Sequence, residues 1–495
     1  MTLFHKKDPV SFVYNTPVII SILIFITIFK LFVLSNSPLE LSVDEAQYWD
    51  WSNDLQFGYF TKPPFIAWLI SFSTYIFGNS EFGIRFFSPI LHLLIAFILW
   101  YTCFIIYGNN SGKFTALIWI TLPLTSLGSF IISTDTPLLF FWSLSLLALT
   151  KIIKNKNFFW SFVLGILISL GFLTKYAMLY FIILLLIFWL IYDRNKFIEL
   201  NKLFITFAVL FIFSLPNIHW NYVNEFSTFN HVIYNADLEH INYNLIQALT
   251  FLLSQFFVLG PIVFLTFIII VWSLFFKEIK LSLLAFFSVT ILLILTIQAF
   301  LKTSNANWAV TAYPAACIMI GGYLAEKKST AINLFIKTGI LINIFISIFI
   351  FNVAFFGKIN LINLDSDPLR KLRGFETQSK ELIEIIKKEN PDALIFNRRS
   401  EITRFNYYMR EYISPSYRKY YLTEASTAKN HYEYFSKFKI EKFKSKQKII
   451  IVTRDKGINK KYLNNFEDFE LVYISKFKNS KNTYRVLYFF KGVLR

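Results

Sequence analysis

Residues 16–34 read TPVIISILIFITIFKLFVL, an apolar run with a single charge, at Lys30. A helix of this length crosses a hydrocarbon layer about 30 Å thick, because each helical residue rises about 1.5 Å. Similar runs follow at 84–107, 114–132, 136–150, 158–174, 177–192, 203–219, 246–276, 281–300, 309–324 and 332–355. The sequence therefore predicts a polytopic α-helical membrane protein with about 11 to 13 transmembrane helices.

The composition indicates the same class. The chain has 495 residues, of which 55% are hydrophobic and only 16% are charged. Its mean hydropathy is +0.50, which excludes an ordinary soluble globular protein. Both cysteines, Cys103 and Cys317, fall within apolar runs, so the sequence predicts neither a disulfide framework nor a thiolate metal site.

The positive charge is concentrated near the C-terminus. Residues 1–355 contain 19 Lys+Arg and 15 Asp+Glu, which leaves 30 and 16 of the totals of 49 and 31 for residues 356–495. The net charges of the two parts are therefore +4 and +14, which sum to +18. A basic segment beside a bilayer is attracted to anionic headgroups. Since no nucleic-acid-binding motif accompanies this charge, we expect membrane lipids and not nucleic acid as partners.

The basic residues in the connections between runs predict the orientation in the membrane. If the N-terminus is inside, the inner connections contain Lys113, Lys151, Lys154, Lys156, Arg194, Lys196, Lys202, Lys277, Lys280, Lys327 and Lys328. The outer connections contain only Lys62, Arg85, Lys175 and Lys302. This bias places the lysine-rich connections in the cytoplasm. Acidic residues predominate on the outer side, where we therefore expect any chemistry.

The C-terminal residues 356–495 are predicted to form a small extracytoplasmic α/β domain. The pattern indicates a helix near 377–388 and strands at 393–396, 447–453, 470–475 and 484–490. An odd number of spans places this domain outside, because long domains translocate largely regardless of their charge. The predicted division is a transmembrane catalytic domain at 1–355, which includes the first outer loop at 35–83, followed by the soluble domain.

The first outer loop and the start of the second span contain three polar motifs in a fixed order. Asp44-Glu45 comes first, Lys62-Pro63-Pro64 follows, and Gly83-Ile84-Arg85 stands at the mouth of the second span. Solvated carboxylates and interfacial Trp, Tyr and Lys anchors also account for such a loop. The loop composition alone therefore does not decide between a membrane anchor and a reaction site.

The order of these motifs resembles the first extracytoplasmic loop of the GT-C glycosyltransferases, in particular the family of protein O-mannosyltransferases and the bacterial aminoarabinose transferase of lipid A. Four later stretches resemble motifs of that family in the same order: Ser133 to Pro137 (STDTP), Gly171 to Tyr176 (GFLTKY), Pro216 to His231 and Asn305 to Pro314 (NANWAVTAYP). One such match is weak evidence of kinship, whereas five in register are strong.

The resemblance implies a GT-C fold and an integral membrane glycosyltransferase. Such an enzyme transfers a sugar, in some members an amino sugar, from a polyprenyl-phosphate donor of the undecaprenyl type, with inversion. Lipid A is the expected acceptor, and a protein acceptor is the alternative. The expected location is the bacterial inner membrane, with the active site and the C-terminal domain on the periplasmic side.

A physical argument leads to the same kind of donor. Nucleotide sugars are cytosolic, so glycosyl transfer outside the membrane requires a lipid-linked sugar that is made inside and flipped across. The rival class is a transporter or flippase of lipid-linked sugars. Transporters place ionisable residues near the bilayer midplane on broken helices. Here the predicted spans are nearly free of charge, with Lys30 and Lys337 near span ends, which favours the enzyme.

Three carboxylates are the candidate catalytic residues. Asp44 is expected to act on the acceptor, as general base toward a hydroxyl or as a positioning group for a phosphate that is already ionised. Glu45 either supports Asp44 or caps a helix start. Asp135 is either functional, as the resemblance implies, or a helix N-cap followed by proline in the first turn.

Three cations are the candidates for the donor phosphate: Lys62, Arg85 and Lys175. They are three of the four basic residues on the outer side of the span region, and fixed cations stabilise the negative charge that grows on a leaving phosphate. The expected sugar- or acceptor-binding residues are Tyr59, Asn307, Trp308 and His231. A divalent metal at His219, His231 and His240 is possible but not favoured, because their spacing matches no zinc signature.

Overall fold

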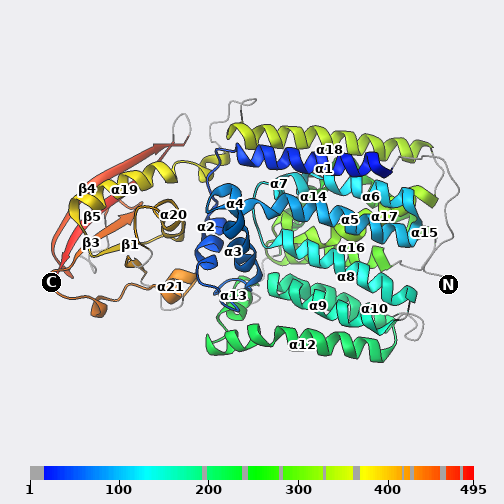
Figure 1. Cartoon of the computed structure of the whole chain (residues 1–495), viewed down its shortest axis with the longest axis horizontal. Helices are drawn as coiled ribbons and strands as arrows, with labels where there is room; N and C mark the ends of the chain where they lie inside the picture. Colours follow the sequence, from blue (N-terminus) through cyan, green and yellow to red (C-terminus); the bar gives the residue numbers. More distant parts are fainter. Residues whose placement is uncertain are drawn as a thin grey trace.

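In the computed structural model, a bundle of apolar helices carries a small sheet domain at one end (Figure 1). The structure describes residues 16–155, 157–191, 198–236, 243–277, 283–326, 330–359, 368–414, 417–423, 428–457, 464–479 and 483–495. Some residues named above lie outside these ranges: Lys156, Arg194, Lys196, His240, Lys280, Lys327 and Lys328.

Helices are the regular secondary structure that the structure describes in the first half of the chain. Its helices are α1 (Thr16–Ser35), α2 (Val43–Ser52), α3 (Phe65–Phe77), α4 (Glu81–Arg85), α5 (Phe87–Tyr107), α6 (Asn109–Thr121), α7 (Pro123–Gly128), α8 (Asp135–Asn155), α9 (Phe158–Thr174), the 3-10 helix η1 (Tyr176–Met178), α10 (Leu179–Ile191) and α12 (Leu200–Val223). The bundle continues with α13 (Ser227–Ala236), α14 (Leu245–Leu259), α15 (Pro261–Lys277), α16 (Leu283–Leu301), η2 (Ala306–Ala312), α17 (Tyr313–Glu326) and α18 (Thr330–Phe356).

The C-terminal region combines helices with one sheet. Its elements are η3 (Pro368–Leu372), α19 (Phe375–Glu389), β1 (Ala393–Phe396), α20 (Arg399–Tyr408), β2 (Lys419–Tyr421), α21 (His431–Phe435), η4 (Ile440–Lys442), β3 (Lys448–Thr453), β4 (Phe466–Lys478) and β5 (Tyr484–Leu494). The strand order is β2-β1-β3-β5-β4. β1 runs parallel to both neighbours, whereas β5 is antiparallel to β3 and β4.

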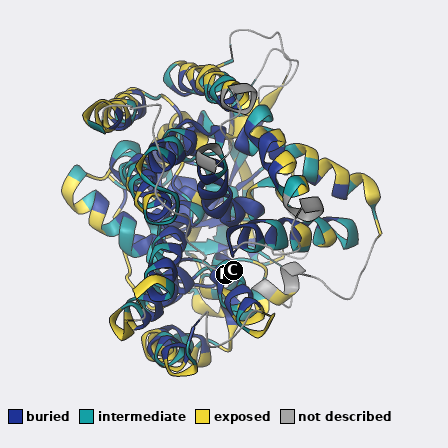
Figure 2. Cartoon of the chain, turned by 90° about the vertical axis from the view of Figure 1, so that its right-hand side faces the viewer, coloured by how far each residue is buried: buried dark blue, intermediate teal, exposed yellow. Residues whose placement is uncertain are grey.

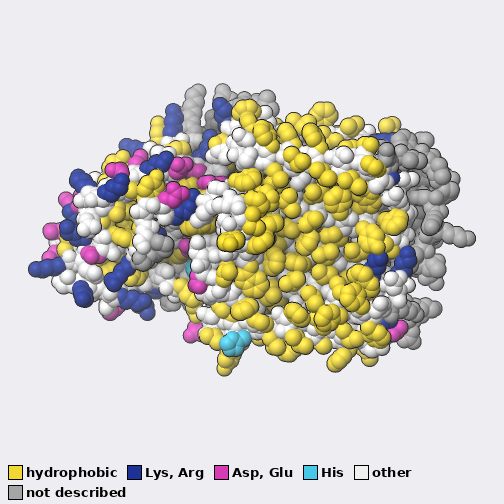
Figure 3. Space-filling model, viewed as in Figure 1, with side chains coloured by type: hydrophobic (Ala, Val, Ile, Leu, Met, Phe, Trp, Pro, Cys, Tyr) yellow, Lys and Arg dark blue, Asp and Glu magenta, His cyan; other side chains and the backbone are white. Residues whose placement is uncertain are grey.

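The outside of the bundle is apolar, as a membrane protein requires. Figure 3 shows a nearly continuous hydrophobic surface over the helices, while charged side chains cover the sheet domain. Figure 2 shows buried residues at the centre of the bundle and exposed ones around it. Phe257 is 80% exposed, and hydrocarbon solvates such side chains without the cost that water would impose. Within the described ranges, six helices are long and apolar enough to cross a membrane, or seven if the bent pair α14–α15 is one span.

All eleven predicted runs coincide with helices over most of their described residues, while the number of crossings stays a prediction. Two runs are broken. The run 114–132 divides at Pro123 between α6 and α7, and 246–276 divides at Gly260, where α14 and α15 form an angle of 114°. Buried Lys30 donates to the carbonyls of Ile120 and Thr125, both at 3.4 Å, one on each side of the first break.

The predicted elements of the C-terminal domain are found, with some corrections. The helix near 377–388 and the strands at 393–396, 447–453 and 484–490 correspond to α19, β1, β3 and β5, and β4 is longer than the predicted strand at 470–475. β2, α20 and α21 were not predicted, because three residues of strand and helices lacking a simple apolar period give little signal. The division of the chain at residue 355 stays a prediction.

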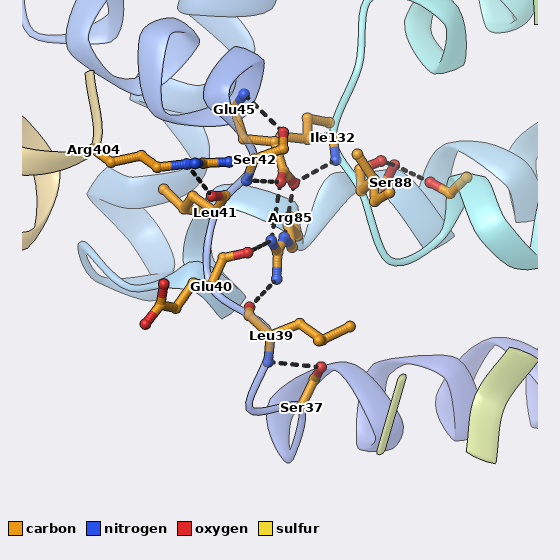
Figure 4. Close-up of polar contacts among 12 residues, drawn as sticks. Ser37, Leu39, Glu40, Leu41, Ser42, Glu45, Arg85, Ser88, Ile132 and Arg404 are labelled. Carbon is orange, nitrogen blue, oxygen red and sulfur yellow. Dashed lines mark hydrogen bonds and ion pairs between the residues drawn. The ribbon is translucent and has the colours of Figure 1, made fainter. Parts of the chain in front are cut away.

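The sheet domain rests on the first outer loop. The Glu40 carboxylate accepts hydrogen bonds of 2.7–3.1 Å from the backbone N–H groups of residues 374–376, at the start of α19. A carboxylate is favourable there, because a helix N-terminus carries partial positive charge and unpaired donors. Arg404 of α20 donates to the carbonyl of Leu41 at 3.1 Å (Figure 4). Helix α20 packs against α2, so the first residues of α20 lie beside the Asp44-Glu45 motif.

Candidate active site

Helix α2 begins inside the first motif. The Ser42 side chain accepts a hydrogen bond from the N–H of Glu45 at 3.2 Å, and the Glu45 carboxylate accepts one from the N–H of Ser42 at 2.9 Å. This reciprocal capping box fixes where the helix starts. It turns Glu45 inward, where it is fully buried, and leaves Asp44 62% exposed. Two neighbouring carboxylates therefore have opposite environments.

Glu45 forms a buried bidentate ion pair with Arg85 (Figure 4). The Nε and Nη2 atoms of Arg85 donate to the two carboxylate oxygens at 2.7 and 2.9 Å. The remaining contacts of Arg85 are to the carbonyls of Leu39 and Glu40, at 2.9 and 3.0 Å. Glu45 also accepts from the N–H of Ile132 at 3.0 Å, so both charged groups are satisfied within the protein.

These contacts bear on the expectations for Arg85 and Glu45. Arg85 uses four of its five N–H groups on Glu45 and on backbone carbonyls, so this geometry does not support direct contact with a donor phosphate. Of the two roles considered for Glu45, the structure contains the helix cap, together with the pair to Arg85. Both residues hold the loop in place through contacts within the protein.

Asp135 and Lys175 form a second ion pair, and it lies at the start of α8. Lys175 Nζ is 2.6 Å from one carboxylate oxygen of Asp135, and Asn307 Nδ2 donates to the other at 2.8 Å. Lys175 and Asn307 follow Asp135 by 40 and 172 residues in the sequence, and both contact its carboxylate. The structure brings together these three predicted site residues.

Asp44 pairs with a residue of the sheet domain. Arg399 Nη2 donates to Asp44 Oδ1, and Arg399 Nε donates to Gln47 Oε1 one turn further along α2. Arg399 is the first residue of α20, and its side chain is partly exposed. The sheet domain thus contributes a cation to the carboxylate predicted as the general base.

Lys62 lies near both ion pairs, since the charges of all four of their residues act on it. It is partly buried, and its ammonium makes no hydrogen bond or ion pair with any residue in the described ranges. Burial, together with the positive charge of Lys175, holds its pKa below the ordinary value of 10.5, although Asp44 and Asp135 act in the opposite direction. Within the described part of the chain, Lys62 is therefore a cation that burial desolvates and no carboxylate pairs.

The other predicted binding residues divide into two groups. Tyr59 is buried, stacks on Trp51 with ring centroids 4.6 Å apart, and donates its hydroxyl to the carbonyls of Trp51 and Asp54. It supports the loop and offers no face to a sugar, which corrects the expectation for Tyr59. His231 lies against Phe60, where burial and the charge of Lys62 lower its pKa to about 4. Trp308 is partly buried against the core.

Three residues of this site were not predicted from the sequence. Arg399 is one, and it follows strand β1 directly, a position at the carboxyl edge of parallel strands that often carries ligand-binding groups. Tyr48 is buried, and burial and the nearby Asp44 raise its pKa well above the ordinary range. His431 packs edge-on to Trp51, and burial and Arg399 lower its pKa to about 3, so both aromatic groups are neutral at pH 7.

Among the residues that the structure describes, no three or more His, Cys, Asp or Glu side chains form a group that could hold a metal ion. His231 in particular contacts an aromatic ring and lies near cations. A metal at the three histidines of the outer loop gains no support from this geometry, and His240 lies outside the described ranges. Absence of a bound metal stays a prediction.

Comparison with known proteins finds relatives of one kind. A family model described as dolichyl-phosphate-mannose-protein mannosyltransferase matches residues 61–220. The lipid A galacturonosyltransferase RgtD of Rhizobium johnstonii is 31% identical over 413 residues, which cover 82% of this chain and 85% of that protein. An undecaprenyl phosphate-alpha-4-amino-4-deoxy-L-arabinose arabinosyl transferase of Pectobacterium atrosepticum is 29% identical over 147 residues, 28% of this chain and 26% of the relative.

A solved structure has the same fold. ArnT from Cupriavidus metallidurans, bound to undecaprenyl phosphate, matches with a TM-score of 0.66 over 96% of this chain and 98% of that chain. The sequence identity is 13%, so the match establishes the architecture and leaves the chemistry to the residues of this site.

The buried pair and Lys62 should respond differently to mutation. Arg85→Ala leaves the Glu45 carboxylate buried without its partner and should lower the free energy of unfolding by about 3–5 kcal/mol. Lys62→Ala removes a desolvated ammonium that has no ion-pair partner in the described ranges, and should leave stability unchanged or raise it. Thermal unfolding of the detergent-purified variants measures both. Equal loss of stability in the two variants would contradict this division of roles.

Proposed function

The chain belongs to the GT-C family of membrane glycosyltransferases, and on this premise we propose that it transfers a sugar from an undecaprenyl-phosphate-type donor to lipid A. The resemblance drawn from the sequence motifs is confirmed for the family by the relative that is 31% identical over most of both chains. That relative is named for action on lipid A, and the partial relative for an undecaprenyl phosphate-linked sugar. The proposal assigns both substrates to this chain.

The arrangement of charge at one end of the bundle carries the proposal. Two ion pairs, Asp44–Arg399 and Asp135–Lys175, lie near the ammonium of Lys62, which has no ion-pair partner among the described residues. Three positive and two negative groups leave one net positive charge. A polyprenyl-phosphate sugar is a phosphodiester with one negative charge, which would neutralise this excess at an apolar surface where unpaired charge is costly.

Lys62 and Lys175 are the proposed ligands of the donor phosphate. During transfer, the bond between the anomeric carbon and the phosphate oxygen breaks, and the leaving phosphate gains a second negative charge. Two fixed ammonium groups stabilise that product-like charge more than the ground state. Asp135 holds Lys175 at 2.6 Å and in turn accepts from Asn307, so its proposed role is to position this cation.

Asp44 is the proposed acceptor-side carboxylate. With a hydroxyl acceptor, the acceptor oxygen bonds to the anomeric carbon on the face opposite the phosphate, and its proton passes to Asp44, so the configuration inverts. With a phosphate acceptor no proton needs to move, and Asp44 positions the reacting group. Its exposed carboxylate suits either role, in contrast to the buried Glu45 beside it. Asn307, Trp308 and His231 are proposed to contact the sugar or the acceptor.

A protein acceptor is the alternative within the same family. The composition of the sheet domain favours lipid A, because a basic domain next to a membrane suits an anionic lipid surface. The transporter hypothesis is less well supported, since the cluster lies at the end of the bundle that bears the sheet domain. A transport site would be expected near the midplane.

Mass spectrometry of lipid A tests the proposal. Lipid A from cells that express the chain should gain the mass of one sugar residue, and Asp44→Asn or Lys62→Ala should abolish this gain while the protein remains in the membrane. Arg398→Ala is a matched control, because Arg398 pairs with Asp455 on the surface of the sheet domain. Lipid A of unchanged mass, with glycosylated proteins instead, would transfer the proposal to the alternative acceptor.

The pH dependence of turnover should report the lowered pKa of Lys62. The ammonium must be protonated to hold a phosphate, so kcat/KM should fall as pH rises through a pKa below the ordinary 10.5. In Lys62→Arg the guanidinium stays protonated, because its pKa lies above about 12, and the alkaline loss should move to higher pH. If kcat/KM fell at the same alkaline pH in wild type and Lys62→Arg, a group other than Lys62 would be responsible for the fall.

Thiol labelling tests the proposed location of the sheet domain in the periplasm. Both native cysteines are buried and provide a low background. Glu384→Cys, at an exposed position of α19, should react with a membrane-impermeant reagent in cells whose outer envelope is permeabilised. Asn155→Cys, at the opposite end of α8 from Asp135, should not react. Labelling of position 155 alone would invert the orientation.

A further inference from the structure

Arg399 occupies a position in the sheet domain that is suited to ligand binding. Strand β1 ends at Phe396, and Arg399 opens α20 only three residues later. Since β2 and β3 both run parallel to β1, this turn lies at the carboxyl edge of the parallel part of the sheet. Groups at that edge commonly contact ligands in α/β folds. Here the edge faces helix α2 of the bundle rather than open solvent.

Arg399 differs from the other arginines at this interface in what it contacts. Arg404 donates to the carbonyls of Leu41 and Lys371, and Arg410 donates to those of Asn79 and Tyr407. Both of those arginines therefore donate to backbone carbonyls on two different segments of the chain. Among the residues that the structure describes, the Arg399 guanidinium instead donates to two side chains of α2, through two of its five N–H groups.

The guanidinium of Arg399 retains free binding capacity. About a third of its side chain and 62% of that of Asp44 are exposed, and its Nη1 atom donates to no residue in the described ranges. Its charge acts on Lys62 and His231, which belong to the bundle side of the site, as well as on His431. Arg399 therefore lies near enough to the proposed donor ligand Lys62 for the two charges to interact.

We propose that Arg399 is a substrate-binding residue: it binds a second oxyanion of the substrates, beside the donor phosphodiester, and releases Asp44 when it does so. This inference rests on the proposed function. The oxyanion is a phosphate of lipid A or the carboxylate of an acidic sugar, two sources of the same chemistry. A guanidinium matches both through two parallel N–H donors.

The exchange of partners has a consequence for Asp44. In the site without substrate, Arg399 neutralises Asp44, and the pair contributes no net charge. When a substrate oxyanion takes over the guanidinium, Asp44 becomes an unpaired carboxylate next to the acceptor, which is the state that a general base or a positioning group requires. The sheet domain would thus complete the site only when both substrates are present.

The experiment measures transfer by the full-length enzyme in detergent with four substrate pairs. The acceptor is lipid A with its phosphates or lipid A treated with phosphatase, and the donor is undecaprenyl phosphate linked to galacturonate or to galactose. Wild type, Arg399→Ala, Arg399→Gln and the control Arg398→Ala are compared. Arg399→Gln keeps a polar contact with Gln47, so it provides a folded variant if the alanine variant is unstable, as thermal unfolding will show.

Removal of the second oxyanion and removal of the Arg399 guanidinium should not have additive effects on KM. With the substrate that carries the oxyanion, Arg399→Ala and Arg399→Gln should raise KM at least about tenfold, while Arg398→Ala stays near wild type. With the matching substrate that lacks the oxyanion, the variants and wild type should have similar KM values. If treated lipid A removes the difference, the oxyanion is the lipid phosphate; if the galactose donor removes it, the oxyanion is the carboxylate.

Two results would overturn the inference. One is an equal loss for the Arg399 variants with all four pairs, which indicates a structural role. The other is no loss with any pair. Failure of wild type to transfer sugar to lipid A with every pair would contradict the proposed function itself, and the inference with it.

Discussion

The bidentate pair between Glu45 and Arg85 is the contact on which the geometry of the site depends. It joins the start of α2 to the end of α4. Arg85 also donates to the carbonyls of Leu39 and Glu40, and Glu45 accepts from the N–H of Ile132. Taking two charges out of water is expensive, and only complete pairing and hydrogen bonding offset that expense. The satisfied pair therefore specifies one arrangement of the loop. Asp44 directly precedes Glu45 in the same helical turn, so the two side chains point in different directions. Burial of Glu45 therefore leaves Asp44 exposed.

The cost of removing charges from water also explains why the site contains few cations. An apolar bundle in a membrane tolerates an ionised group only where a partner or headgroup water solvates it. Asp135 meets this need for Lys175, and Asp44 meets it for Arg399. Lys62 is the exception, since burial lowers its pKa and no residue in the described ranges pairs with it. A group held in this way gains most from an anionic ligand, because binding relieves a desolvation that the fold has already imposed.

The sequence predicts the helices of the bundle well, because hydrocarbon demands long apolar runs whatever the tertiary packing. Through motif order it also names Asp135, Lys175 and Asn307 as candidate site residues, but it did not predict that Lys175 and Asn307 both contact Asp135. The pairing of Arg85 was not predictable in this way: several carboxylates lie on the outer side, and only the fold selects Glu45. Arg399 was missed for a related reason, since its role arises from docking of the sheet domain on α2, and docking has no local sequence pattern.

Helix α8 places the site relative to the membrane. It has Asp135 as its first residue and Lys154 in its last turn, and its 21 residues span about 30 Å, close to the thickness of a hydrocarbon layer. If Lys154 lies among the headgroups on the cytoplasmic side, Asp135 and its partner Lys175 must lie at headgroup level on the other side. A phosphate on a polyprenyl chain occupies that same level, because its tail stays in hydrocarbon while its charge requires solvation. The depth of the ion pair in the membrane thus matches the depth of the bond that has to break.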